Sequence, residues 1–354
     1  MDTLNELTAL SHEFGTASYV KGGGGNTSVK LGTTLWIKPS GMTLGGLKNA
    51  DFIPLDRPSV RSLFTLSLPD SAAAREELVK NTMANAVLKG YKGRPSVESP
   101  LHEILVGKYV VHTHPELVNG MTCSVRGKAA CETLFPAAMW VPYIDPGYTL
   151  CMELYKRLED YGRVHSRQPA VIFIENHGVF VSADSAENIR MLYQQVMGTL
   201  QAEYQKKGVT GFVAGPVSPM DPQSPECRML KAVMGAEAEH VACSPWVQVA
   251  EGPLTPDHIV YSKSWPFMGK LDAPMLAEFK DVHGYFPKVL VTDDGVYGVG
   301  QSGRNASLAL ELALDGAAVR RYAEAFGGVQ YMTGRATDFI ENWEVESYRR
   351  TQVA

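Results

Sequence analysis

Two histidines separated by one residue, His112 and His114, are the residues of this chain best suited to chemistry. They lie in KYVVHTHP, which predicts a buried strand, and side chains at positions i and i+2 of a strand project from one face. Taken alone, the pair favours two histidines that merely line that face. A third histidine, His177 in ENHG, follows another apolar strand. Because catalytic zinc takes three protein ligands, often imidazoles, the three together favour a metal site.

A carboxylate precedes the histidine pair by 14 residues. Glu98, in PSVESPLH, can move a proton at carbon if it lies beside a metal-stabilised enediolate. Its alternative role is to complement a helix dipole from the first turn of a helix. His102, one turn further on, can pair with Glu98 or be structural. The other five histidines have no informative spacing and are expected to be structural or exposed: His12, His165, His240, His258 and His283.

Two glycine-containing segments can bind an anion. The run Gly22–Gly25 is followed by Asn26, Thr27 and Ser28, and can present backbone N–H groups and side-chain donors. The second segment, KPSG at 38–41, is a polar turn after an apolar strand. Neither is a P-loop or a GxGxxG motif, and a glycine run alone is more typical of a flexible turn than of an anion site.

The elements that must position these residues alternate between helical and extended patterns. Helices are expected over 2–19, 71–89 with Ser71 as N-cap, from Glu116, and over 185–207; strands are expected in SVKLG, TLWIKPSG, KYVVHTHP and AVIFIENHGVFVS. Glycine turns between the strands make a mixed or antiparallel sheet as consistent with the pattern as a parallel one.

Residues 209–225 are rich in Gly, Pro and Ser and predict a linker, with domains over 1–212 and 226–354 on either side of a 213–225 connection. Two segments on either side of it also match each other. IFIENHGVFVSADSAENI (172–189) and VLVTDDGVYGVGQSGRNA (289–306) share a strand, a polar turn and Ser-x-x-Asn. The C-terminal domain can therefore be a degenerate repeat, in which Asp294 stands where the first copy has His177.

Composition excludes several classes of protein. The 354 residues are 45% hydrophobic and 20% charged, which is typical of a globular rather than a disordered or fibrous chain. A net charge of -5 disfavours nucleic-acid binding. The five cysteines are odd in number and form no CxxC, the N-terminus has no signal-peptide pattern, and no apolar run reaches membrane-spanning length. We expect a cytoplasmic protein without a membrane partner.

In order along the chain, GGGGNTS, LWIKPSG, PSVExxxH, VVHTHP, VPYIDPG and IENHGVF resemble the class II aldolase/adducin family over about residues 5–205. Members include L-fuculose-1-phosphate and L-rhamnulose-1-phosphate aldolases and L-ribulose-5-phosphate 4-epimerase. The resemblance implies an α/β fold with a central, mainly antiparallel sheet flanked by helices, here with a smaller α/β C-terminal domain. It also implies a homo-oligomer, usually a tetramer with active sites at subunit interfaces.

Residue by residue, the resemblance implies that His112, His114 and His177 bind the metal and that Glu98 is the acid/base carboxylate. It implies five positions that hold a substrate phosphate: Gly25, Asn26, Ser40, Gly41 and Ser96. Two departures stand out. Val97 replaces a second phosphate-binding serine, and the family's interface tyrosine has no match, with Tyr143 and Tyr148 as the nearest candidates.

These observations predict a metal-dependent class II aldolase that cleaves a ketose, as the phosphate or free, to an aldehyde and a dihydroxyacetone-type fragment. The expected metal is Zn²⁺, with Mn²⁺ or Co²⁺ as alternatives. A sugar-phosphate 4-epimerase or decarboxylase would use the same chemistry, and a non-catalytic adducin-like scaffold is the alternative outside enzymes. NAD is not expected because no GxGxxG follows a strand. The sequence does not identify the sugar.

Overall fold

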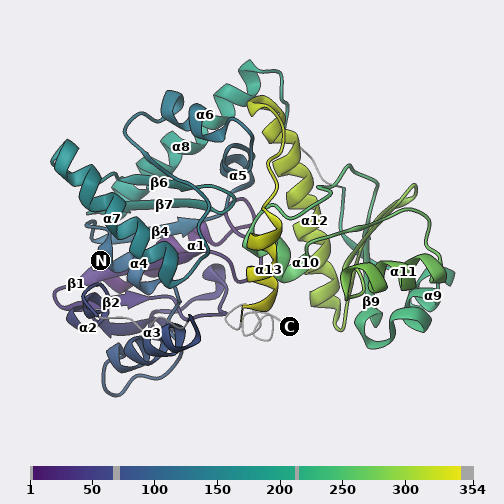
Figure 1. Ribbon diagram of the computed structural model, residues 1–354, viewed down its shortest axis with the longest axis horizontal. Coiled ribbons are helices and arrows are strands. Elements are labelled where there is room, and N and C mark those ends of the chain that lie inside the picture. The colour runs from purple at the N-terminus through teal and green to yellow at the C-terminus, as the bar shows by residue number, and fades with distance from the viewer. Residues whose placement is uncertain (1–2, 67–71, 212–214, 344–354) are drawn as a thin grey trace. The chain divides into compact units, whose positions relative to one another are not determined.

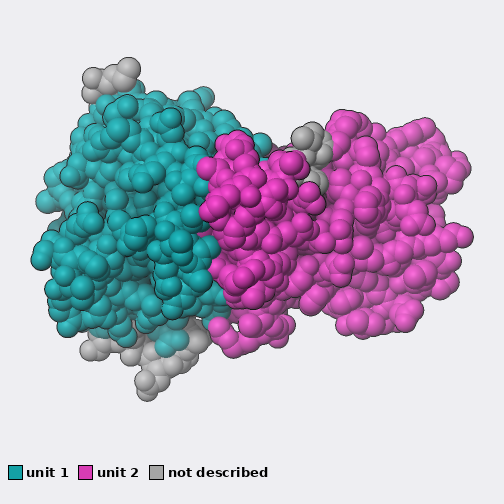
Figure 2. Space-filling view, turned by 90° about the horizontal axis from the view of Figure 1, so that it is seen from above, with its two compact units in different colours: residues 1–118, 128–200 teal, residues 119–127, 201–354 magenta. Residues whose placement is uncertain are grey.

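The computed structural model describes residues 3–66, 72–211 and 215–343. They form two compact units: residues 1–118 with 128–200 (unit 1), and residues 119–127 with 201–354 (unit 2; Figure 2). The predicted linker 213–225 begins outside the described residues, as does the predicted N-cap Ser71. Within that linker, Ser218–Pro219 forms the short strand β8. The predicted domain boundaries stay a prediction.

Unit 1 is built on a seven-stranded sheet in the order β3-β2-β1-β4-β7-β6-β5 (Figure 1). Its strands are β1 Asn26–Leu31, β2 Thr34–Ile37, β3 Ile53–Asp56, β4 Tyr109–Thr113, β5 Met139–Val141, β6 Val171–Ile174 and β7 Gly178–Ala183. All neighbours are antiparallel except β5 and β6. The prediction of a mainly antiparallel α/β fold is therefore confirmed.

Helices cover both faces of this sheet. They are α1 Thr3–Phe14, α2 Arg57–Ser62, α3 Ala72–Ala86, α4 Ser99–Ile104, α5 Glu116–Thr122, α6 Gly127–Leu134, α7 Tyr148–His165 and α8 Ala186–Lys206, with short 3₁₀ turns at Leu44–Gly46 and Asn49–Asp51. On one face α4 and α7 bury an apolar core against the central strands. On the other, Tyr193 of α8 packs on Phe14 of α1. Among the described residues, no helix is both long and apolar enough to cross a membrane.

Unit 2 has the same strand arrangement as the central part of unit 1. Its strands are β8 Ser218–Pro219, β9 His240–Ser244, β10 Phe267–Met268, β11 Val289–Thr292 and β12 Gly295–Gly300. Its helices are α9 Pro225–Met234, α10 Pro256–Ser262, α11 Ala273–His283, α12 Gly303–Ala323 and α13 Gly334–Asn342, with 3₁₀ turns at Gly235–Ala238 and Glu324–Phe326. The sheet order β10-β11-β12-β9-β8 matches β5-β6-β7-β4-β1, with a parallel pair first and antiparallel pairs after it.

The two segments matched in the sequence occupy equivalent places in these sheets. Each folds as a hairpin followed by a helix of 21 residues, β6–β7–α8 in one case and β11–β12–α12 in the other. In unit 1, His112 pairs with Phe180; the equivalent pair in unit 2 is Cys243 with Tyr297. Unit 2 therefore has Cys243 and Asp294 where unit 1 has His112 and His177.

One residue of β1 is a buried lysine. Lys30 is 7% exposed, and its ammonium donates to the carbonyls of Leu105 (2.6 Å) and Gly107 (2.8 Å). Burial lowers the pKa of Lys30 from 10.5 to about 7, although the carboxylate of Glu103 partly opposes that shift. The folded chain thus releases a proton that the unfolded chain retains until well above pH 7.

Between pH 7 and pH 10, the contribution of Lys30 to the free energy of unfolding should rise by about 3 kcal/mol, because its amine binds more protons in the unfolded state in that interval. Buried Cys131, whose pKa is raised, acts in the opposite direction, so the contribution of Lys30 is measured as a difference between two variants. Lys30→Met should remove most of this rise. Urea unfolding at both pH values measures it, with the exposed Lys128→Met as the control. A rise in Lys30→Met equal to that of the unchanged chain would show that Lys30 is not its source.

Candidate metal centre

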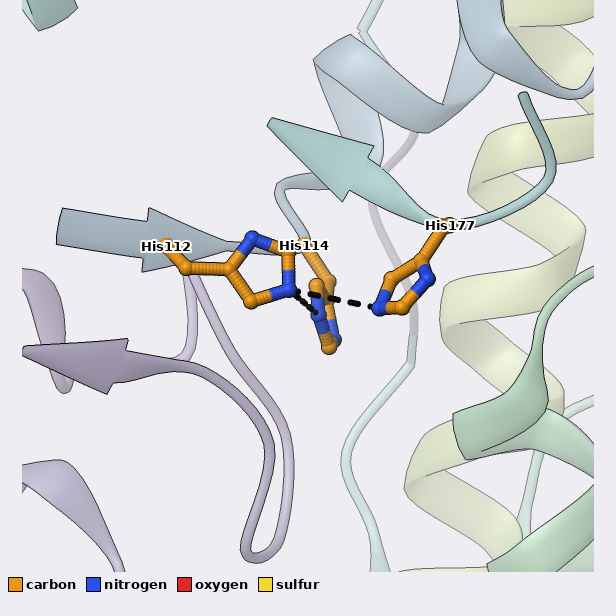
Figure 3. A group of neighbouring side chains, drawn as sticks. All are labelled: His112, His114 and His177. Carbon is orange, nitrogen blue, oxygen red and sulfur yellow. Dashed lines mark hydrogen bonds between the residues drawn. The ribbon is translucent and has the colours of Figure 1, made fainter. Parts of the chain in front are cut away.

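Three histidine rings of unit 1 converge on one point, as the sequence predicts. His112 lies in β4, His114 directly follows that strand, and His177 lies in the turn between β6 and β7. Figure 3 shows their rings directed toward one another. The Nε2 atom of His112 lies 2.9 Å from Nε2 of His114 and 3.2 Å from Nε2 of His177. Within the described chain, this is the one group of three or more His, Cys, Asp or Glu side chains suited to a metal.

Strand pairing brings the three histidines together. β4 and β7 are neighbours, with His112 opposite Phe180 and Thr113 opposite Val179. The turn that carries His177 therefore lies beside the end of β4. Gly178 permits this close approach, because a Cβ atom there would lie 2.4 Å from the carbonyl oxygen of Thr113 and 2.7 Å from Cδ2 of His114. Only glycine allows β7 to begin against this segment.

The donor set fits a divalent cation. Two nitrogens bound to one tetrahedral zinc ion lie about 3.3 Å apart, close to the spacing of the His112 pairs. Nδ1 of His112 donates to the carbonyl oxygen of Val179 at 3.0 Å, which leaves the Nε2 lone pair directed toward the other two rings. Such a bond from the non-ligating nitrogen is the usual way in which a protein orients a metal-binding imidazole. The group is consistent with a divalent metal.

Glu98 lies beside the three histidines. It occupies the N-cap position of α4, yet its side chain does not cap the helix. One carboxylate oxygen accepts a hydrogen bond from the amide of Asn26, and the other lies 3.4 Å from Nε2 of His112 and 3.6 Å from Nε2 of His177. Burial acts to raise the pKa of Glu98, but the neighbouring imidazoles, His112 foremost, hold it well below its ordinary value. The helix-dipole alternative therefore does not account for this side chain.

The predicted anion-binding positions lie on loops that contact one another. Pro39 bridges to Pro95, the backbone N–H of Ser40 donates to the carbonyl of Arg94 (2.9 Å), and that of Ser96 donates to the carbonyl of Lys38 (3.3 Å). Lys38 also donates from its ammonium to the carbonyls of Gly23 (3.2 Å) and Met42 (2.7 Å). The loops containing Gly25, Asn26, Ser40, Gly41 and Ser96 are thus joined. Their role in binding an anion stays a prediction.

Besides Asn26, which donates to Glu98, two of these positions contact the centre directly. Gly25 has a φ of +70°, and a Cβ atom there would lie 2.8 Å from the carbonyl oxygen of His112. The hydroxyl of Ser96 accepts a hydrogen bond from the backbone N–H of Glu98 at 3.2 Å. The first glycine loop and the 94–98 loop are therefore fixed against the histidine and carboxylate cluster.

Of the two roles considered for His102, pairing with Glu98 or a structural role, the structure favours the structural one. Nδ1 of His102 instead bonds to the hydroxyl of Ser28 at 2.7 Å, because the ring turns into the core beside Phe180. Burial lowers the pKa of His102 to about 3, so this ring is neutral at physiological pH. Of the tyrosines considered for the interface role, Tyr148 donates its hydroxyl to the carbonyl of Leu63 at 3.1 Å. The interface role stays untested.

Sequence reasoning missed Tyr193, which holds the strand between two of the histidines. Its hydroxyl, buried in the core, bonds to Oγ1 of Thr113 (2.8 Å) and to the carbonyl of Val111 (3.2 Å). Thr113 stands between His112 and His114. The sequence does not predict this contact, because Tyr193 occupies an apolar position of an amphipathic helix, as any tyrosine of the core does.

We expect Tyr193→Phe to weaken metal binding by about tenfold, because residues that orient metal ligands contribute on that scale. Competition with a chromophoric chelator measures the dissociation constant directly. Tyr109→Phe is the matched control: Tyr109 lies in β4, the strand that the Tyr193 hydroxyl contacts, but its own hydroxyl donates to the carboxylate of Glu6. Equal affinities in the two variants would show that the Tyr193 hydroxyl does not orient the site.

Comparison with known protein families agrees with the fold and with the three-histidine site. Residues 5–204 match the model of the class II aldolase and adducin N-terminal domain. The chain belongs to this family. The remaining residues lie outside the match.

Individual relatives match about half of the chain. It is 29% identical over 194 residues to the Bacillus subtilis protein named uncharacterized oxidoreductase YuxG, a match that spans 52% of this chain and 26% of that one. It is 28% identical over 174 residues to L-fuculose phosphate aldolase of Methanocaldococcus jannaschii, spanning 46% and 73%. Among solved structures, the N-terminal class II aldolase domain of a Thermoplasma acidophilum protein is 22% identical with a TM-score of 0.49, spanning 57% and 93%.

Proposed function

We propose that this chain is a metal-dependent class II aldolase that cleaves a ketose or ketose phosphate to an aldehyde and a dihydroxyacetone-type fragment. The observation that carries the proposal is the position of the Glu98 carboxylate, one oxygen of which lies 3.4 Å from Nε2 of His112 in the three-histidine group. A carboxylate and a metal site so close together suit chemistry in which a proton moves at a carbon next to a carbonyl. Family membership supports the same assignment.

His112, His114 and His177 would hold the cation, most simply Zn²⁺ and otherwise Mn²⁺ or Co²⁺, and the bound cation would supply Lewis-acid stabilisation of negative charge on the carbonyl side of the substrate. The other roles belong to side chains and loops of the protein itself. Glu98 accepts or delivers the proton at the carbon released by cleavage. Asn26 donates to that carboxylate and fixes its orientation. The joined loops around Gly25, Ser40 and Ser96 hold an anionic group of the substrate, where one is present.

We further propose that the protein acts in the cytoplasm as a homo-oligomer whose partner is a small sugar or sugar phosphate. The net charge of -5 supports only the choice of partner, because it disfavours nucleic acid as a ligand. Size-exclusion chromatography with light scattering measures the oligomeric state. A monomer at micromolar concentration would contradict the proposed homo-oligomer.

The test of the activity is product identity. Full-length protein loaded separately with Zn²⁺, Mn²⁺ and Co²⁺ is incubated with ketose 1-phosphates and the corresponding free ketoses, and aldehyde release is followed by a coupled reduction. Aldehyde formation supports the aldolase. An epimerised sugar without aldehyde, or release of carbon dioxide from a sugar acid, would replace it with an epimerase or a decarboxylase. A protein that binds no metal and turns over no substrate would favour the scaffold.

A further inference from the structure

The Glu98 carboxylate is carried by a short helix. α4 has six residues, and a helix of this length is not stable in isolation. Glu98 occupies the N-cap position of α4 without capping it. Its place beside the histidine group therefore depends on the contacts that hold α4 against the sheet.

Side chains from one face of β1 contact α4 along its length. Residues at alternate positions of a strand share a face, and two residues of a strand span about 6.6 Å. Four residues of a helix span about 6 Å, so a strand and a helix that lie side by side can meet at every second residue of one and every fourth of the other. Three such contacts join the two elements: Asn26 with Glu98, Ser28 with His102, and Lys30 with the carbonyl of Leu105.

The middle contact, between Ser28 and His102, is the most deeply buried of the three. Both residues are 0% exposed, and Oγ of Ser28 lies 2.7 Å from Nδ1 of the imidazole. Nε2 of the same ring has no hydrogen-bond partner among the described residues. The bond to Ser28 therefore fixes the orientation of the ring and joins the middle of α4 to β1.

Apart from the contact of Glu98 itself, the other anchors of α4 are less specific for its position along β1. The ammonium of Lys30 donates to backbone carbonyls and divides its donors between two of them. The carboxylate of Glu103 accepts from Nε of Arg57 at 2.8 Å and from Nε of Arg61 at 2.6 Å, so it joins α4 to α2 rather than to β1. The middle contact, which matches one side chain of the helix to one side chain of the strand, is the stricter constraint.

The ring of His102 also packs toward the histidine group. It lies edge-on to Phe180, with ring centroids 5.6 Å apart, and Phe180 stacks on His112 at 3.8 Å. A displaced His102 would therefore disturb the contact between Glu98 and His112 from both sides. It would move the helix that carries the carboxylate and the aromatic ring that packs on the imidazole.

We propose that Ser28 and His102 are positioning residues, whose hydrogen bond fixes α4 against β1 and so holds the Glu98 carboxylate at the three-histidine group. The inference rests on the proposed role of Glu98 as the proton carrier. Neither residue contacts the substrate in this arrangement. Loss of the bond should therefore lower kcat and leave KM unchanged, because it affects an interaction made in the transition state rather than substrate binding.

The test uses Ser28→Ala in the full-length, metal-loaded protein. We expect kcat for aldehyde release to fall by about tenfold or more, because a small displacement of a catalytic group is costly. KM and metal content should stay unchanged. In the Glu98→Gln background the same substitution should cause no further fall, since the carboxylate that it displaces is already absent. If Ser28→Ala does not unfold cooperatively, Ser28→Cys replaces it, because a thiol of similar size is only a weak hydrogen-bonding group.

The matched control is Ser11→Ala, in α1. Ser11 is also 0% exposed, and its hydroxyl lies 2.6 Å from Oγ1 of Thr27, a residue on the opposite face of β1 from Ser28. This control should leave kcat unchanged. A second readout needs no substrate: amide hydrogen exchange in α4, followed by mass spectrometry, should be about tenfold faster in Ser28→Ala and unchanged in Ser11→Ala.

Three results overturn the proposal: unchanged exchange in α4 of Ser28→Ala, an equal fall in kcat in Ser11→Ala, or a full further fall in kcat when Ser28→Ala is added to Glu98→Gln. Failure of the proposed function gives a different result. If the unchanged protein cleaves no ketose with Zn²⁺, Mn²⁺ or Co²⁺, the aldolase assignment fails, and the exchange measurement alone decides whether the bond between Ser28 and His102 holds α4 in place.

Discussion

Replacing His112 by alanine should lower the metal content of the purified protein from about one ion per chain to background and reduce turnover by about 10³-fold. His112 is the middle member of the group, with its Nε2 within 3.2 Å of both other Nε2 atoms. Its loss leaves two ligands that no longer surround one position. The fall in turnover follows because Lewis-acid stabilisation is worth several kcal/mol, and each 1.36 kcal/mol is about tenfold in rate.

Elemental analysis by mass spectrometry and the aldehyde-release assay are run on the same preparations. His177→Ala should behave like His112→Ala, because its Nε2 lies 3.2 Å from Nε2 of His112 in the same three-histidine group. The control is His165→Ala, whose ring is exposed at the end of α7. Full metal content and full activity in both His112→Ala and His177→Ala would eliminate the three-histidine site as the catalytic centre.

The histidine group could be predicted from the sequence because strand periodicity is local. Alternation placed His112 and His114 on one face, and the apolar run before ENHG placed His177 at a strand end. The contacts of Glu98 are not local in this sense. Its hydrogen-bond partner, the side-chain amide of Asn26, lies 72 residues earlier, in β1. Only the pairing of β1 with β4 brings Asn26 opposite His112, and no pattern within either segment specifies that register.

His258 gives a second example. The sequence gives it no informative spacing and predicts a structural or exposed residue, and its ring is buried. Its carboxylate neighbour Asp315 comes from α12, 57 positions further along the chain. Packing of α10 against α12 places them 3.3 Å apart. Likewise, the short sequence match between 172–189 and 289–306 indicates one hairpin and helix. The five-strand correspondence between units 1 and 2 becomes visible only from the strand pairings.

Glu98→Gln should retain the metal and still lose turnover by about 10²- to 10⁴-fold, the usual contribution of a positioned acid/base. Glutamine has the size of glutamate and can still bond to Asn26, so the loops around it keep their contacts. The nearest Glu98 oxygen is 3.4 Å and 3.6 Å from the histidine nitrogens, beside the metal position rather than among the three imidazole ligands. We therefore expect Glu98→Gln to remove the group that carries the proton and to leave the metal site unchanged.

Hydrogen exchange at carbon separates this role from a structural one. In deuterated water, the dihydroxyacetone-type fragment should take up deuterium at its reacting carbon with the unchanged protein, and about 10²-fold more slowly with Glu98→Gln. Glu175→Gln, in the turn that carries His177, is the control, because its carboxylate accepts from the backbone N–H of Tyr143 instead. Exchange at the full rate in Glu98→Gln would move the proton transfer to another group. Loss of metal in Glu98→Gln would instead make Glu98 a metal ligand. Because the exchange rate and the metal content are measured independently, they distinguish a proton carrier from a ligand.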